Sequence, residues 1–245
     1  MGRFHVSPEA ISGDRVVFDA QETRHLVRVL RLRPGAVVQA VDGQGSEFTV
    51  RLESLQGREA VGRILSRSDR RTESPLAITL AQGIPKGEKM EWIVKTVTEL
   101  GAASVVPLVT ERTIVRLPPW RWRSRQRRWQ RVAKEAAKQC GRSVIPAVEP
   151  VRTLDEFIVE RVAAELAVCL WEGERQGLRD ILDSIRGVPA SVLIVVGPEG
   201  GLAVHEVERL RASGFRTAGL GPRILRTETA GPVGIALLQA RFGDL

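Results

Sequence analysis

Short runs of alternating apolar and polar residues occupy the first quarter of the chain. The runs are residues 16–18, 36–41, 47–52 and 60–65, and turn residues such as Arg33-Pro34-Gly35 separate them. This alternation predicts half-buried strands that form a small β-barrel or sandwich. One stretch differs: residues 20–30 follow a helical period, with Leu26, Val27 and Leu30 predicted to face inward.

The pattern changes after the polar segment RSDRRTES, which predicts an interdomain linker at residues 67–75. Strand-like runs then alternate with helical patterns. The runs are residues 76–81, 105–109, 166–171, 192–196 and 217–220, and the helical patterns are residues 86–100, 120–140, 155–162, 178–185 and 205–212. Such alternation predicts a mostly parallel sheet with helices on both faces, an α/β architecture.

A last apolar helix carries Pro232 near its start. Because proline is tolerated only in the first turn of a helix, this helix is predicted to begin near Ala230.

Two of the predicted strands end in glycine-bearing loops. Residues 192–196 stop at GPEGG, and residues 217–220 stop at Gly221-Pro222. Glycine has no Cβ and adopts positive φ, so the backbone of such loops can approach a ligand closely. Ligands of parallel α/β sheets bind outside the carboxyl ends of the strands, which makes these two loops the candidate site.

Composition narrows the partners and the compartment. The 37 Lys and Arg residues outnumber the 29 Asp and Glu residues, and the net charge of +8 favours a polyanionic partner such as RNA. The chain has no apolar signal-peptide core and no transmembrane-length apolar run, so we expect a cytoplasmic protein without a membrane partner. Cys140 and Cys169 have no second thiol or histidine at ligand spacing, so neither a disulfide framework nor a metal site is expected.

Common nucleotide-binding signatures are missing. Neither a P-loop nor a Rossmann glycine fingerprint follows a predicted strand, which disfavours Rossmann-type methyltransferases and dehydrogenases. The glycines of DGQGSE, residues 42–47, lie between two strands and predict a hairpin.

Residues 120–131 combine arginines with tryptophans. Arginines interleaved with aromatic residues are typical of surfaces that stack on unpaired bases. Helical spacing nevertheless predicts an inward stripe composed of Trp122, Trp129, Val132, Ala133, Ala136 and Cys140. The spacing favours tryptophans in the core or an interface, with the arginines on a solvent-facing or RNA-facing side.

GPEGG, the segment LGPRILRTETA at residues 220–230 and the apolar last helix together resemble the ribosomal RNA small subunit methyltransferase E family. The segments HLVRVLRLRPG, KGEKMEWIVKTVTELG, PLVTERT and RWQRVAKEAAKQCGR extend this resemblance over nearly the whole chain, with Lys138 where an acidic residue is common. The family comprises SPOUT-class enzymes that use S-adenosylmethionine to methylate N3 of a uridine in 16S rRNA.

The resemblance implies two domains: a PUA-like RNA-binding β-barrel at residues 1–71 and a SPOUT α/β domain with a trefoil knot at residues 75–245. It also implies S-adenosylmethionine as cofactor, the 16S rRNA of the small ribosomal subunit as partner, and a homodimer formed through the last helix. The small residues Gly231, Gly234 and Ala236 give that helix a face suited to close packing.

The resemblance assigns residues as well. The cofactor-binding residues, in three loops, are Leu170, Glu172, Gly197, Pro198, Glu199, Gly200, Gly201, Leu220, Gly221, Ile224 and Leu225. The RNA-binding residues, which are basic or imidazole groups suited to phosphate contacts, are Arg3, Arg24, His25, Arg28, Arg31, Lys86 and Lys89.

The chemistry requires a group that deals with the proton on N3. Uracil N3–H is a weakly acidic imide, so the nitrogen must lose its proton before or during attack on the methyl group. Arg226 is predicted to stabilise the developing uracil anion, and Glu228 is the nearest carboxylate that could act as the base. Glu228 equally suits a cap of the last helix, where a carboxylate is stabilising.

Two other functions stay open. One is a SPOUT enzyme that methylates a different RNA position, which base-resolved mapping of methylated rRNA would reveal. The other is a non-catalytic RNA-binding or ribosome-assembly factor, which would not bind S-adenosylmethionine.

Overall fold

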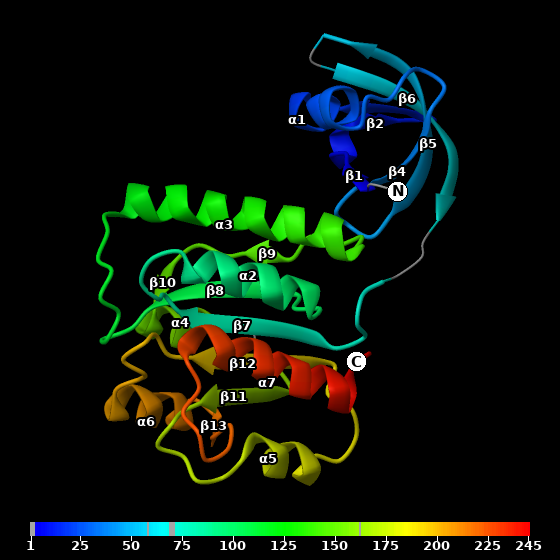
Figure 1. Ribbon diagram of the computed structural model, residues 1–245. Coiled ribbons are helices and arrows are strands. Elements are labelled where there is room, and N and C mark those ends of the chain that lie inside the picture. Colours follow the sequence, from blue (N-terminus) through cyan, green and yellow to red (C-terminus); the bar gives the residue numbers. More distant parts are fainter. Residues whose placement is uncertain (1–2, 58, 69–71, 162) are drawn as a thin grey trace. The chain divides into compact units, whose positions relative to one another are not determined.

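The computed structural model describes residues 3–57, 59–68, 72–161 and 163–245. The chain divides into two compact units, one made of Met1–Glu73 and Ala137–Ile145 and the other of Ser74–Ala136 and Pro146–Leu245 (Figure 1). Part of the predicted linker, residues 69–71, lies outside the described residues. The predicted combination of a small β unit with an α/β unit is confirmed, whereas the trefoil knot stays a prediction.

The first unit is built on an antiparallel-rich sheet. Its elements are β1 (Arg3–His5), η1 (Pro8–Ala10), β2 (Ile11–Ser12), β3 (Arg15–Phe18), α1 (Ala20–Arg24), η2 (His25–Val29), β4 (Val37–Val41), β5 (Glu47–Gln56) and β6 (Glu59–Ser68). Among the described residues, six strands pair in the order β1-β4-β5-β6-β3-β2. All four predicted strands are confirmed, and the β4–β5 pairing confirms the hairpin, in which Asp42 Oδ1 accepts the N–H groups of Gln44 and Ser46.

The predicted helix at residues 20–30 is confirmed, but its inward face is narrower than predicted. Leu26 is fully buried, whereas Val27 is 39% and Leu30 is 42% exposed, so the prediction for these two residues was wrong. The reason is the π-helical geometry of η2, in which the N–H of Leu30 donates to His25 O. The wider turn breaks the period on which the prediction rested.

Residues 137–145 belong to the first unit, and two ion pairs connect them to it. Lys138 Nζ lies 2.7 Å from Glu22 Oε1, and the two side chains are 9% and 1% exposed. The guanidinium of Arg142 lies 2.6 Å from Glu73 Oε2. These pairs connect the end of α3 and the segment after it to earlier residues of the first unit.

The second unit alternates strands and helices. Its elements are β7 (Ala77–Gly83), α2 (Lys89–Glu99), β8 (Ser104–Val109), α3 (Pro119–Cys140, whose last residues belong to the first unit), β9 (Ala147–Val148), β10 (Arg152–Thr153), α4 (Leu154–Glu160), β11 (Leu166–Leu170), α5 (Leu178–Ser184), β12 (Ser191–Val196), α6 (Val204–Ala212), β13 (Arg216–Ala218) and α7 (Thr227–Phe242). The sheet order is β10-β8-β7-β12-β11-β13, with β9 beside β8, and the described pairings are parallel. The predicted parallel sheet is confirmed.

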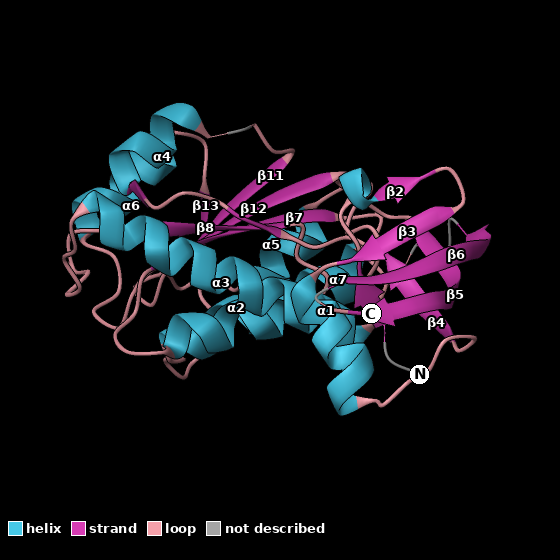
Figure 2. Cartoon of the chain, turned by 90° about the horizontal axis from the view of Figure 1, so that it is seen from above, coloured by secondary structure: helices cyan, strands magenta, loops and turns pink. Residues whose placement is uncertain are grey.

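Helices cover both faces of this sheet, as predicted (Figure 2). Alternate residues of one strand face opposite layers: Leu193 and Val195 of β12 pack with α4 and α6, while Ile194 lies against α7. A Cβ on Gly234 would come within 2.9 Å of Leu170 Cδ1, so α7 approaches the sheet closely only because this residue is glycine. The close packing predicted for the small residues of the last helix is therefore made in part with its own sheet.

The start of α7 differs from the prediction. The helix begins at Thr227 and not near Ala230, so Pro232 lies inside it. A buried hydrogen-bond network stabilises the first turn: Gln82 Nε2 donates to Thr227 Oγ1 (2.9 Å), and the Thr227 hydroxyl donates to Gly197 O (2.7 Å). These tertiary contacts outweigh the local cost of an internal proline.

A second network joins the loop after β11 to α6 and β13. Glu174 accepts hydrogen bonds from the Thr217 hydroxyl (2.6 Å), from the Arg211 guanidinium (2.8 Å) and from the N–H groups of Arg175 and Gln176. The Thr217 hydrogen bond above all, with the backbone N–H of Gln176 next, lowers the pKa of Glu174 to about 2.

We expect Thr227→Val to reduce the free energy of unfolding by about 1 to 3 kcal/mol, because it removes two buried hydrogen bonds, the one from Gln82 Nε2 and the one to Gly197 O. Denaturant titration measures this loss. Thr229→Val, on the same helix and only partly buried, serves as the control. Equal effects of the two substitutions would contradict the importance of the network.

Glu174→Gln should destabilise the protein near neutral pH by about 1 to 2 kcal/mol. The folded-state pKa lies below the unfolded one, so the contribution of Glu174 is present above about pH 4.5 and is lost as the pH falls towards about 2. Unfolding midpoints of the two proteins should therefore converge on acidification. A difference that does not depend on pH would contradict this prediction.

Candidate active site

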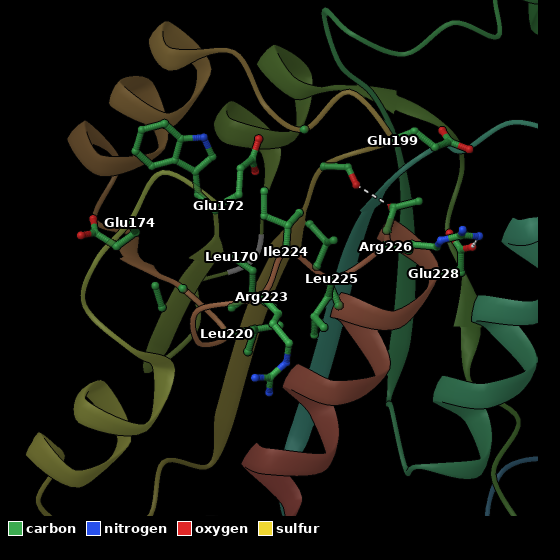
Figure 3. A pocket seen from close by; sticks show the side chains of 18 of the residues that line it. Leu170, Glu172, Glu174, Glu199, Leu220, Arg223, Ile224, Leu225, Arg226 and Glu228 are labelled. Carbon is green, nitrogen blue, oxygen red and sulfur yellow. Dashed lines mark hydrogen bonds and ion pairs between the residues drawn. The ribbon is translucent and has the colours of Figure 1, made fainter.

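The candidate site is a pocket of about 400 Å³ at the carboxyl ends of β11, β12 and β13 (Figure 3). The predicted cofactor-binding residues that line it are Leu170, Glu172, Gly197, Pro198, Glu199, Gly201, Leu220, Gly221, Ile224 and Leu225. Gly200 is not among the lining residues, and its carbonyl accepts a hydrogen bond from Arg112 (2.7 Å). Both predicted catalytic residues, Arg226 and Glu228, line the pocket.

Backbone conformation shapes two of the loops. Gly201 has φ +69°, and a Cβ there would collide with the carboxylate of Glu172. Gly221 has φ +98°, a conformation that other L-residues rarely adopt. The loops thus present main-chain atoms to the pocket, as the glycine pattern predicted.

The pocket has chemically different sides. Figure 3 shows Glu172 and Glu174 on one side and Glu199, Arg226 and Glu228 on the other, with apolar side chains between them. The volume is within the range of small-molecule sites. An apolar cradle with main-chain groups and a carboxylate side fits a nucleoside that carries a positive charge, which describes S-adenosylmethionine.

Lys89, at the start of α2, joins two carboxylates at the pocket. Its Nζ lies 3.1 Å from Glu199 Oε1 and 3.2 Å from Glu228 Oε2. The hydrogen bond to Glu199, with a smaller contribution from Glu228 and against the effect of burial, raises the pKa of Lys89. Burial opposes any lowering of the pKa of Glu199, but the N–H groups of Glu199 and Lys86 and the Lys89 ammonium outweigh it and lower that pKa.

Arg226 precedes α7 directly and is the most exposed charge of this group. Its side chain is 83% exposed, and Nη1 lies 4.0 Å from Glu228 Oε1. Because the guanidinium is exposed and lies far from Glu228 for an ion pair, it can reach a substrate in front of the pocket. Glu228, by contrast, is 19% exposed and lies between Lys89 and Arg226.

Sequence reasoning missed three contributors to this site. Gln82 and Thr227 hold the loops together from beneath, and Glu174 lines the pocket. Gln82 had a recognisable signal, since its amide directly follows the apolar pair Leu80-Ala81 and precedes a glycine. Glu174 had none, because its partners Thr217 and Arg211 come from distant positions of the chain.

The predicted RNA-binding residues occupy different surroundings. In the first unit, Arg24, Arg28 and Arg31 are exposed, whereas His25 is partly buried beside the Phe4 ring (5.4 Å between centroids). Arg3 pairs with Glu47 (3.0 Å) and donates to Gly141 O. In the second unit, Lys86 is exposed in the loop before α2, outside the helix predicted for it. Their roles stay predictions.

The stripe predicted on α3 is confirmed in part. Trp129, Ala133 and Ala136 are buried, whereas Trp122 is half-buried and Cys140 is exposed. Within the described residues, no helix is long and apolar enough to cross a membrane, and no group of His, Cys, Asp or Glu side chains is arranged to hold a metal ion.

Two family models match the chain. An RNA methyltransferase domain matches residues 72–239, and an RNA methyltransferase PUA domain matches residues 18–65. Ribosomal RNA small subunit methyltransferase E of Bacillus subtilis is 36% identical over 216 residues, which cover 86% of this chain and 84% of that protein. The protein of the same name from Synechocystis is 34% identical over 240 residues, which cover 97% of this chain and 77% of that protein.

Solved structures lead to the same family as the sequence comparisons. Ribosomal RNA small subunit methyltransferase E from Neisseria gonorrhoeae, bound to S-adenosylmethionine, superposes with a TM-score of 0.90 at 34% identity over 100% of this chain and 99% of that one. A putative methyltransferase from Legionella pneumophila, in complex with the same cofactor, gives a TM-score of 0.90 at 34% identity over 99% of this chain and 98% of that one. By fold, domain content and sequence, the chain belongs to the ribosomal RNA small subunit methyltransferase E family.

Proposed function

We propose that this protein transfers a methyl group from S-adenosylmethionine to N3 of a uridine in the 16S rRNA of the small ribosomal subunit. The names of the relatives support an rRNA substrate, and two solved relatives contain the cofactor. The observation that carries the finer proposal is an exposed arginine beside a carboxylate, both at the rim of a pocket built from glycine-bearing loops.

The residues present suit methylation of a weak acid. When bound, S-adenosylmethionine supplies an electrophilic methyl group on a sulfonium. Arg226 stabilises the negative charge that develops on the uracil ring as N3 loses its proton. Glu228 accepts that proton, and Lys89 positions the Glu228 carboxylate by an ion pair (3.2 Å).

The first unit supplies RNA affinity in this proposal. Arg24, Arg28 and Arg31 are exposed on or next to α1 and η2, where they are suited to phosphate contacts. The matching PUA domain model supports the same role. Uracil N3 is paired in a duplex, so the target must be unpaired or flipped out before it can enter the site.

We also propose that two copies of the chain associate through α7. One stripe of this helix packs on the sheet, but Val233, Ala236, Leu237 and Ala240 form a second apolar stripe that the described residues leave at least partly exposed. Leu237, the largest exposed side chain of this stripe, is 42% exposed. A helix that is apolar on all sides is usually buried on all sides.

Methyl transfer to isolated small-subunit RNA or to assembled subunits, followed by base-resolved mapping, tests the proposed function. Product at a uridine N3 would support it. Methylation at any other atom would identify a different RNA methyltransferase, and no affinity for S-adenosylmethionine in calorimetry would leave a non-catalytic assembly factor.

Arg226→Ala should lower kcat by about 100-fold or more at every pH, because it removes a group that stabilises the transition state.

Glu228→Gln should lower kcat near neutral pH by about 100-fold or more. Activity of the Glu228 variant should recover at alkaline pH, where N3 ionises without help. Radiolabelled methyl transfer measures both, with unchanged cofactor affinity as the test of folding.

Arg186→Ala is the matched control for the arginine, since Arg186 is exposed and does not line the pocket. If Arg226→Ala kept the wild-type kcat, Arg226 would not stabilise the transition state as proposed. A constant deficit of Glu228→Gln across pH would point to a structural role in place of proton transfer.

Sedimentation should give the mass of a dimer for the wild-type chain and of a monomer for Val233→Glu/Leu237→Glu, because charges on the exposed stripe of α7 would oppose its burial. Val159→Glu, at an exposed valine of α4, is the control and should leave the dimer intact. A monomeric wild type would exclude the proposed pairing.

A further inference from the structure

A second concave surface lies at the same edge of the parallel sheet as the pocket. This groove, of about 840 Å³, is lined by the end of β8, by β10 with the turn before it, and by the first half of α3 and the loop that leads to it. Only β7 separates β8 from β12 in the sheet (Figure 1). Neighbouring strands are about 4.8 Å apart, so the groove begins roughly 10 Å from the loop that carries Gly197.

Positive charge dominates the groove. Four arginines line it, against one carboxylate: Arg116, Arg123, Arg127, Arg152 and Glu156. The carboxylate of Glu156 is already hydrogen-bonded within the protein, because it accepts from the backbone N–H and the hydroxyl of Thr153. Among the described residues, neither Arg123 nor Arg127 has an ionic or hydrogen-bond partner, and both are exposed. Two unpartnered guanidinium groups one helical turn apart suit the oxygens of a phosphate.

Apart from the polar side chains of Gln126 and Thr153, the rest of the lining is apolar and includes an aromatic ring. Trp122, Leu117, Pro119, Pro150 and Val151 face the same space as the arginines. Trp122 is half-buried, in contrast to Trp129 on the same helix, which is 2% exposed and belongs to the core. A tryptophan in an open groove beside arginines matches the stacking platform and charged track of proteins that bind single-stranded nucleic acid.

Hydrogen bonds connect the groove to the pocket along the carboxyl edge of the sheet. Arg112, in the loop after β8, donates to Gly200 O (2.7 Å), and the N–H of Glu111 donates to Glu206 Oε1 (2.8 Å) of α6. The loop that separates the two sites is thus hydrogen-bonded to the GPEGG loop and its following helix. A chain that leaves the pocket mouth towards β8 would reach the groove without crossing a face of the sheet.

We propose that this groove binds an unpaired nucleotide of the substrate RNA, a few positions from the target uridine. The base lies against Trp122, and its phosphate lies between Arg123 and Arg127. This inference rests on the proposed function, because it takes the RNA to be the substrate of the neighbouring pocket. It adds an RNA-binding contact outside the pocket and outside the first unit.

The test compares two pairs of substitutions on one helix. Arg123→Gln/Arg127→Gln alters the groove, and Arg121→Gln/Arg131→Gln makes the same charge change at exposed positions of α3 that do not line it. The probe is a labelled single-stranded oligoribonucleotide of about ten nucleotides with a central uridine. Affinity is measured by fluorescence anisotropy at several salt concentrations, and cofactor affinity and melting temperature verify folding.

We expect the groove pair to weaken RNA binding by about tenfold and to reduce the slope of log K against log salt by about 0.7, the value for one phosphate contact on a single strand. The control pair should change affinity by less than about threefold. In methyl transfer, the groove pair should raise KM for RNA and leave kcat unchanged. Equal losses in the two pairs would overturn the proposal, and so would unchanged binding by the groove pair.

Stacking is tested by a double-substitution cycle. An abasic residue placed a few positions from the central uridine should weaken binding to the wild-type protein, and Trp122→Leu should make the protein insensitive to it. Trp120→Leu, at an exposed tryptophan outside the groove, should retain the sensitivity. Loss of sensitivity in both variants, or in neither, would contradict the role of Trp122. Failure of the proposed function is distinguishable, because it would appear as a wild-type protein that binds RNA but methylates none.

Discussion

The hydroxyl of Thr227 connects three elements of the candidate active site by hydrogen bonds. It receives a hydrogen bond from Gln82 at the end of β7 and donates one to the carbonyl of Gly197 at the end of β12. Because Thr227 is also the first residue of α7, these bonds fix where the loop Leu220–Arg226 ends and where Glu228 points. A slip of the helix would break both of these buried hydrogen bonds, so they favour one position of α7.

Charge around the pocket follows from that constraint. With α7 fixed at Thr227, Glu228 lies within an ion-pair distance of Lys89 on α2, and Lys89 is paired in turn with Glu199 on the loop after β12. Three elements thus contribute to one cluster, whereas Arg226 remains exposed at the edge of it. In the proposed reaction, an anion that forms in front of Arg226 is stabilised by the positive charge of its guanidinium.

Much of this could be predicted from the sequence, because the signals were local. Strand-length apolar runs that stop at Gly197 and Gly221 identified both loops and the sheet edge on which they lie. The start of α7 could not be predicted, since Pro232 argued for a later start and the opposing hydrogen bonds come from Gln82 and Gly197, far away in the chain. The exposure of Val27 and Leu30 was missed because a π-helical turn has no distinctive sequence pattern. Local propensity fails at such positions, and one of them, the start of α7, also builds the site.

Trp122 and Trp129 show how one stripe can divide between two roles. Both lie on the same side of α3 by spacing, yet Trp129 packs in the core and Trp122 faces an open groove with Arg123 and Arg127. Around Trp122 the groove is lined by the end of β8, by β10 and by the turn before β10, and these elements leave the ring half-buried. Binding energy from a nucleotide held there is remote from the reacting nitrogen, and such remote energy can hold a weakly nucleophilic base in line with the methyl donor. In the proposed complex, contacts in the groove therefore help to orient the uridine in the neighbouring pocket.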